Sequence, residues 1–296
     1  MSFRKTITEE IENKRKGLGQ SSVKTYTSIL FNLFKKLDGK EEDLKFFDND
    51  KPILEFLKDK TPQTRKTILS ALFVITGNDE FRKVMIEDCG VVNKEYKEQK
   101  KSVKENENWI STDLIKEKYN ERLEQVQLMF SKKAVINAGV VIEYLLLAFL
   151  GGVSGIAPRR SMDYTELKTK NYDTKTDNYY SKGILYFNKY KTVEKYGLQT
   201  LNLKEKAPVL DKILKTWGKV NHTEYVLYSS NGNKLTSPQI TKYLNKIFDK
   251  RVSTDMLRHI YLTNLYKDIP ALQQMEETAN QMSHNLATAM TYVKKE

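Results

Sequence analysis

The chain has 296 residues, of which 39% are hydrophobic and 30% charged, as is typical of a globular protein rather than a disordered one. This length suffices for two ordinary domains, each with its own hydrophobic core. Fifty Lys and Arg residues against 38 Asp and Glu residues give a net charge of +12, which favours a polyanionic partner such as nucleic acid. A solvated basic surface without such a partner is the alternative.

The first hundred residues predict a small all-helical domain. Apolar residues recur at helical spacing in 23–37 and 68–75, and Pro52 and Pro62 stand at positions favoured in the first turn of a helix. A further helix is expected at 79–98. The lysines between these apolar positions predict either a solvated surface or contacts to a DNA backbone.

The stretch 99–108 is rich in Lys, Glu and Asn and predicts a domain boundary, so we expect domains at 1–104 and 105–296. Helices are expected at 112–130 and 133–150, followed by a glycine-rich break that ends in an arginine pair. The most apolar stretch, 134–152, contains Asn137 and Glu143, which favours a buried helix over a membrane span.

Strand patterns follow in the second domain. Residues 183–190 and 197–203 alternate apolar with polar side chains and are joined by a turn, and 225–229 predicts one more strand. From 237 to its end the chain is expected to be helical. The predicted fold is therefore mainly α (α+β), with a small antiparallel sheet in the second domain.

Cys89 is the only cysteine, which excludes a disulfide framework and a thiolate zinc site. No phosphate-binding loop pattern is present either. The N-terminus lacks the apolar core of a signal peptide, so we expect a cytoplasmic or nuclear protein that is not secreted and has no membrane partner.

Certain polar residues lie in or beside hydrophobic segments of the C-terminal half: Arg160, Lys191, Arg258, His284 and Tyr292. Two arginines, a lysine and a histidine can neutralise one phosphodiester, and a tyrosine is a nucleophile that can attack it. A lysine in a hairpin turn can reach a DNA groove and protonate the leaving 5′ oxygen. The set indicates DNA strand cleavage through a phosphotyrosine.

These residues stand in motifs that resemble the tyrosine recombinase (integrase) family of site-specific DNA recombinases. Leu257–Thr263 resembles the family's Leu-Arg-His-x-x-x-Thr core, and Met282–Asn285 followed by Tyr292 is similar to its Gly-His and nucleophile motif. Arg160–Asp163 resembles the Arg-x-x-Glu/Asp motif, and Lys191 stands where the family has its hairpin lysine.

The resemblance spans 112–296, and residues 1–104 match the family's helical core DNA-binding domain in architecture only. It implies a catalytic domain at 105–296 that closes a clamp on double-stranded DNA, a 3′-phosphotyrosyl intermediate, and a homotetramer on paired DNA sites. It implies no cofactor and no metal. The Ala-Pro-Arg-Arg form of the first motif is more similar to that of recombinases from eukaryotic viruses and mobile elements than to that of bacterial ones.

The implied roles are phosphate binding by Arg160, Arg258 and His284, general acid catalysis by Lys191, and nucleophilic attack by Tyr292. Three alternatives remain open. A type IB topoisomerase uses the same motif order to relax single duplexes, a catalytically inactive DNA-binding clamp keeps the fold without the cutting, and a basic helical adaptor binds protein partners.

Three of the implied roles have rival residues of the same type. Arg159 competes with Arg160, Lys189 and Lys195 compete with Lys191, and Tyr261 and Tyr266, on another helix, compete with Tyr292.

Three positions depart from the family pattern. Asp255 stands where the family usually has histidine or lysine, and we expect it to cap a helix rather than to act as a base for Tyr292. Ser283 replaces the usual glycine, and Tyr292 follows His284 by eight residues, one fewer than is commonest. His259, beside Arg258, is expected to hydrogen-bond nearby backbone.

Overall fold

The structure, a computed structural model, describes residues 2–40, 42–131 and 135–292. Its contacts divide the chain into two compact units, one of residues up to 100 together with those from 270 onward, the other of residues 101–269. Each unit is described by itself. The domain division into 1–104 and 105–296 stays a prediction.

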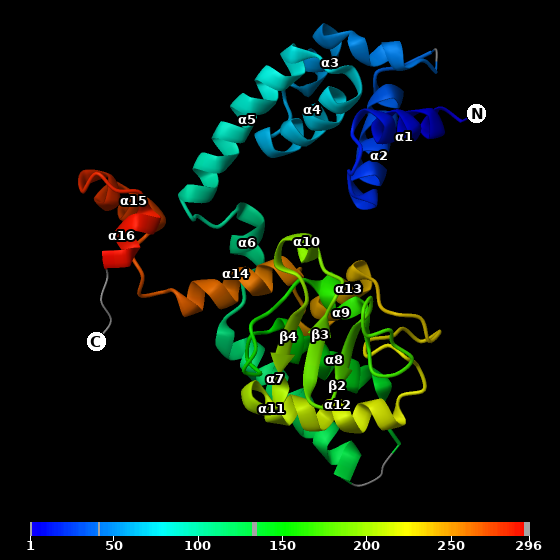
Figure 1. Cartoon of the computed structure of the whole chain (residues 1–296), viewed down its shortest axis with the longest axis vertical. Helices are drawn as coiled ribbons and strands as arrows, with labels where there is room; N and C mark the ends of the chain where they lie inside the picture. The colour runs from blue at the N-terminus through cyan, green and yellow to red at the C-terminus, as the bar shows by residue number, and fades with distance from the viewer. Residues whose placement is uncertain (1, 41, 132–134, 293–296) are drawn as a thin grey trace. The chain divides into compact units, whose positions relative to one another are not determined.

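The N-terminal part of the first unit is helical throughout (Figure 1). Its elements are α1 (Phe3–Lys14), α2 (Gln20–Lys36), the 3₁₀-helix η1 (Leu44–Asp48), α3 (Asp50–Leu57), α4 (Pro62–Thr76) and α5 (Asp79–Lys97). Thr61 caps α4 by accepting from the Thr64 backbone N–H, with Pro62 in the first turn, as the sequence predicts. The apolar face of α4 packs against α1, α2 and α5 and forms the centre of this core.

The C-terminal part of the first unit holds α15 (Leu272–Gln281) and α16 (Leu286–Tyr292). The helical prediction for the chain's end is confirmed as far as Tyr292; residues 293–296 lie outside those described.

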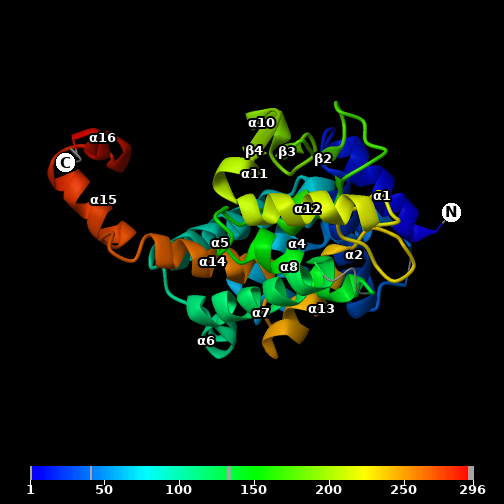
Figure 2. The ribbon, with the colours of Figure 1, turned by 90° about the horizontal axis from the view of Figure 1, so that it is seen from below.

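The second unit is built around α8. Its helices are α6 (Val103–Asn108), α7 (Thr112–Ser131), α8 (Ala138–Leu150), α9 (Ser161–Thr165), α10 (Val193–Tyr196), α11 (Leu203–Lys206), α12 (Pro208–Val220), α13 (Ser237–Phe248) and α14 (Thr254–Leu265). Every residue of α8 from Val141 to Leu150 is buried, and α8 contacts α7, α13 and α14 (Figure 2). The buried helix predicted for 134–152 is thus confirmed from Ala138 onward, whereas 132–134 lie outside the described residues.

Helix α8 contains one charged residue, Glu143. Its carboxylate accepts from Arg122 Nε at 2.7 Å and from Lys246 Nζ at 3.1 Å, so the buried charge has two cationic partners. Among the described residues, no helix combines the length and the apolar composition that crossing a membrane requires.

The sheet has four strands in the order β1 (Leu167–Lys168), β2 (Asn178–Ser181), β3 (Ile184–Phe187) and β4 (Gln199–Asn202). Strands β3 and β4 pair antiparallel, as predicted for 183–190 and 197–203. No strand was predicted at β2, which pairs antiparallel with β3 and parallel with the two-residue β1, so the sheet is mixed and not purely antiparallel. Leu185 and Phe187 of β3 point into the core that includes α8. The sheet lies over one side of α8 in Figure 1.

The strand predicted at 225–229 is wrong. Tyr225 and Tyr228 make only isolated bridges, to Lys168 and Lys234, and no ladder forms. Val226 and Leu227 between them are fully buried, so the apolar pattern that suggested a strand reflects two core contacts of an irregular segment.

Candidate active site

The segment that leads to the first arginine motif is shaped by glycines. Gly152 has φ +68°, and a Cβ there would lie 2.3 Å from the ring of Tyr261 in α14. Gly155 has φ +94°, and its Cβ would lie 2.1 Å from the carbonyl oxygen of Lys206. Only glycine fits at both positions, so this segment can run close to α14 and α11 before it enters α9.

Arg159 and Arg160 differ in what they contact. Arg159 Nε donates to Asp163 at 2.8 Å, its Nη1 donates to Gln199 at 2.7 Å, and its guanidinium lies 4.1 Å from the ring centre of Phe187. The side chain of Arg160, half-buried at the N-cap of α9, has no hydrogen bond or ion pair with any described residue. Arg159 is therefore committed to the fold, and the guanidinium of Arg160 is available to a ligand.

Three arginines of this unit act electrostatically on the buried carboxylate of Asp163. Its side chain is 3% exposed, and its Oδ1 has no hydrogen-bond partner among the described residues. Burial raises the pKa of the Asp163 carboxyl, and the positive charges of Arg159, Arg160 and Arg258 oppose that rise. Arg160 and Arg258, far apart in the sequence, thus lie within electrostatic range of one carboxylate.

Arg258 lies on α14 and pairs with Asp255 one turn earlier. Its Nη1 donates to Asp255 Oδ1 at 2.9 Å, and the Arg258 side chain is 29% exposed whereas that of Asp255 is 74% exposed. The prediction that Asp255 caps the helix is wrong. The cap is Ser253, whose hydroxyl accepts from the Met256 N–H, because α14 begins at Thr254 and leaves Asp255 inside the first turn.

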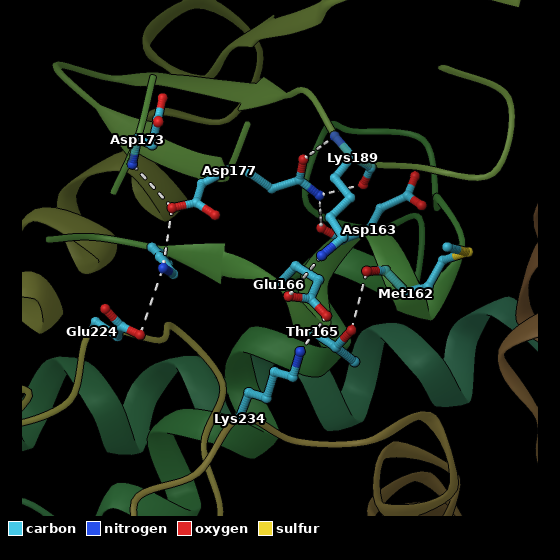
Figure 3. A network of polar contacts seen from close by, with 11 residues as sticks. Met162, Asp163, Thr165, Glu166, Asp173, Asp177, Lys189, Glu224 and Lys234 are labelled. Carbon is cyan, nitrogen blue, oxygen red and sulfur yellow. Dashed lines mark hydrogen bonds and ion pairs between the residues drawn. The ribbon is translucent and has the colours of Figure 1, made fainter. Parts of the chain in front are cut away.

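Lys191 follows β3 in an exposed turn and has no partner among the described residues. The two rival lysines are both engaged. Lys189 Nζ lies 3.8 Å from Glu166, which also pairs with Lys234 (Figure 3), and Lys195 Nζ lies 5.0 Å from the ring centre of Tyr196. Lys191 is the lysine of this turn that is free to approach a ligand.

His259, next to Arg258, makes a side-chain contact instead of the predicted backbone contact. Its Nδ1 lies 2.7 Å from Glu105 Oε1 in α6. Glu105 also accepts from the Ser102 backbone N–H in a capping box, and these bonds lower the pKa of Glu105 to about 2, the backbone bond from Ser102 contributing most. His259 thus links α14 to α6.

His284 and Tyr292 lie together in the C-terminal part of the first unit. Their rings stack with centres 5.1 Å apart and planes 9° from parallel. His284 Nδ1 is buried without a partner among the described residues, and Tyr292 is 61% exposed. The two predicted residues are therefore neighbours, with the tyrosine accessible to a large substrate.

The turn that carries His284 requires a left-handed residue. Ser283 has φ +58°, and the His284 N–H donates to the Ala279 carbonyl at 2.9 Å, closing the end of α15. This backbone conformation accounts for the glycine expected at this position. A groove of about 350 Å³ between α15 and α16 is bordered by Met275, Met282 and Tyr292.

The candidate site residues therefore fall into two sets, one in each unit. Arg160, Lys191 and Arg258, with Asp255, belong to the second unit, and His284 with Tyr292 belongs to the first. Within the described residues, no group of three His, Cys, Asp or Glu side chains is arranged to hold a metal ion. Sequence reasoning missed Asn178, a buried side chain at the start of β2 for which no motif gave a signal.

No protein-family model matches this chain, and no curated protein matches it either. Solved structures with a similar chain course include a dimer of lambda integrase bound to a COC′ core site, at 13% identity and a TM-score of 0.47, covering 91% of this chain and 90% of that one. XerA recombinase follows at 14% identity and 0.35, covering 99% and 94%. The XerH site-specific recombinase bound to its difH substrate in a pre-cleavage complex has 15% identity and 0.40, covering 99% and 91%. All three TM-scores lie below 0.5, so a functional assignment has to come from this chain's own residues.

Proposed function

We propose that the protein cleaves and rejoins DNA strands at specific sites through a phosphotyrosine, as a tyrosine recombinase. The observation that carries this proposal is that Arg160 and Arg258 both lie within electrostatic range of Asp163, with the Arg160 side chain unpaired among the described residues. Two partly exposed guanidinium groups in one region suit an anionic ligand that can take two charge-assisted contacts.

In the proposed reaction Tyr292 Oη attacks the scissile phosphorus, and the bond from phosphorus to the 5′ oxygen breaks. The proton of the tyrosine hydroxyl passes to solvent water, and Lys191 gives a proton to the leaving 5′ oxygen. Arg160, Arg258 and His284 stabilise the negative charge on the non-bridging oxygens. The product is a 3′-phosphotyrosyl ester, which stores the bond energy until a 5′ hydroxyl reverses the reaction, so no nucleotide is needed.

The partner in this proposal is double-stranded DNA. A net charge of +12 suits a polyanion, and the lysines on the N-terminal helices offer contacts to phosphates. A homotetramer on two paired sites is the assembly that the family resemblance implies. The proposal requires His284 and Tyr292 to act on the same phosphate as the arginines.

A catalytically inactive DNA clamp is the second candidate. The observation in its favour is the ion pair from Asp255 to Arg258, which places a carboxylate on a guanidinium that the reaction needs. Relaxation of single duplexes, as by a type IB topoisomerase, differs from recombination only in the DNA substrate.

The test uses duplexes from the genomic neighbourhood of the coding sequence, each nicked close to a candidate site so that cleavage releases a short fragment and traps the adduct. A covalent adduct that survives SDS is expected with the native chain and with Tyr266→Phe, which alters another exposed tyrosine. Tyr292→Phe should bind the duplex and give no adduct.

Binding by all three proteins without any adduct would reject the enzyme in favour of the inactive clamp. Where adducts form, exchange between two sites would identify a recombinase, whereas relaxation of a supercoiled circle without exchange would identify a topoisomerase.

A further inference from the structure

We infer that Asn178 is a positioning residue that holds the Lys191 turn against the helix of Arg160; this inference rests on the proposed function. Asn178 begins β2 and is fully buried. Its Nδ2 donates to the Asp163 carbonyl at 2.9 Å and to the Lys189 carbonyl at 2.7 Å, and its Oδ1 accepts from the Lys189 N–H at 2.7 Å.

These bonds reach both parts of the predicted phosphate site in the second unit. Lys189 precedes Lys191 by two residues, and Asp163 follows Arg160 by three. Figure 3 shows Lys189 and Asp163 side by side, with Glu166 and Lys234 next to them. One amide thus fixes the backbone at the start of the lysine turn to the backbone of the arginine helix.

Asparagine is the side chain that this position requires. The site offers two carbonyl oxygens and one N–H, and an amide supplies two donors and one acceptor in the matching order. Aspartate would turn an oxygen toward two carbonyl oxygens, and an apolar side chain would leave three buried or partly buried backbone groups without this partner.

Other contacts also hold this turn. The Lys189 side chain is 64% exposed and 3.8 Å from Glu166, a geometry that contributes little to the position of the backbone. The Arg159 guanidinium lies over the rings of Phe187, at the end of β3, and Tyr190, and Asn188 Nδ2 donates to two carbonyls in the segment before β2. Among the described residues, Asn178 is the side chain whose hydrogen bonds join the backbone of the turn to the backbone of α9, whereas Arg160 also has the neighbouring ion pair of Arg159 with Asp163 as a support.

A general acid is effective only within hydrogen-bond reach of its leaving group, so a displaced turn should affect protonation of the 5′ oxygen first. This gives a test that separates positioning from folding. A substrate with sulfur in place of the bridging 5′ oxygen releases a thiolate, which needs no proton from Lys191.

The variants are Asn178→Ser, whose small side chain leaves room for water, and Asn178→Asp. The matched control is Asn221→Ser: Asn221 is also buried, its Nδ2 donates to the Tyr225 carbonyl and its Oδ1 accepts from the Thr223 N–H, and none of these bonds reaches Asp163 or the lysine turn. Adduct formation is measured on the ordinary and the sulfur-bridged duplex, and thermal unfolding is followed for each protein.

Asn178→Ser should slow adduct formation about 100-fold on the ordinary duplex. On the sulfur-bridged duplex, the rate of adduct formation by Asn178→Ser should lie within about threefold of the native rate, because cleavage of that duplex needs no proton from Lys191. Lys191→Ala should show the same rescue, and adding Asn178→Ser to it should cause no further loss. Asn221→Ser should be close to the native chain on both duplexes.

Equal losses on both duplexes, or a full additional loss in the double variant, would overturn the inference and leave Asn178 a structural residue. If Asn178→Asp fails to fold, the serine variant and the double variant still decide the question. Absence of any adduct with the native chain would reject the proposed function together with this inference.

Discussion

At the scale of single residues, the adjacent Arg159 and Arg160 are expected to have different roles. Arg159 stabilises the fold, whereas Arg160 is expected to bind the phosphate. Arg159→Ala would leave the buried Asp163 carboxylate without its cation, so we expect the free energy of unfolding to fall by about 2 kcal/mol. Arg160→Ala removes no side-chain hydrogen bond or ion pair with a described residue and should change that energy by less than about 0.5 kcal/mol, while adduct formation drops about 100-fold or more.

Urea unfolding and the adduct assay on both variants check this pair. The opposite pattern, a stable Arg159→Ala protein without activity and an unstable Arg160→Ala protein, would assign the phosphate to Arg159.

Asp255 provides the second prediction at this scale. Its exposed ion pair with Arg258 competes with a phosphate for the guanidinium, and such a pair is worth at most about 1 kcal/mol. Asp255→Asn should therefore tighten DNA binding by up to about fivefold and leave adduct formation at least as fast. Asp268→Asn, which removes another exposed carboxylate, controls for the change in net charge.

Fluorescence anisotropy on a labelled duplex measures the affinity. A loss of adduct formation by about 100-fold in Asp255→Asn, with binding intact, would instead make Asp255 the base that activates Tyr292.

At the scale of elements, the turn between α15 and α16 stores local strain. A non-glycine residue in the left-handed region costs about 1 kcal/mol, and Ser283 occupies it at φ +58°. Ser283→Gly should slow hydrogen exchange of the Met282 and His284 amides about two- to fivefold, whereas Ser283→Ala, which keeps the Cβ, should not. Faster exchange in the glycine variant would contradict this: the greater conformational entropy that glycine gives the unfolded turn would then outweigh the relief of strain.

The link between α6 and α14 should make stability depend on pH. The pKa of Glu105 is about 2 in the folded chain and ordinarily 4.5, so the unfolded state binds more protons between these values. Its contribution is therefore present above about pH 4.5 and is lost as the pH falls toward 2.

Glu105→Gln should lower the free energy of unfolding by about 1 kcal/mol at pH 7, and the difference from the native chain should shrink below pH 4.5. Glu107→Gln on the same helix, where the side chain is exposed, should have no such effect. Urea unfolding at pH 7, 5 and 3.5 tests this, and a difference that stays constant over that range would contradict it.

At the scale of the whole molecule, the helices were predictable where an apolar stripe continues for several turns. α4 and α13 show this pattern, and the structure caps them with Thr61 and Thr236, the second of which was not predicted. The burial of α8 also followed from its composition. Such features depend on neighbours in the sequence, which the chain displays directly.

Contacts between distant residues were not predictable in the same way. Asn178 is linked to Lys189 and Asp163 through the register of a short sheet, and no local pattern specifies that register. Asp255 was misassigned because two further residues, Ser253 and Thr254, can also begin the helix. The choice of Arg160 over Arg159 stays a prediction, although the partners of Arg159 now give it a physical reason.

The account as a whole depends on one residue forming a bond to DNA. The most direct measurement is to trap the adduct on a nicked duplex, digest the DNA and the protein, and locate the attached nucleotide by peptide mass spectrometry. The account predicts a 3′-linked nucleotide on the peptide that contains Tyr292, and on no other tyrosine. A nucleotide on Tyr261 or Tyr266, or tight binding to a duplex that yields no linked peptide, would contradict it.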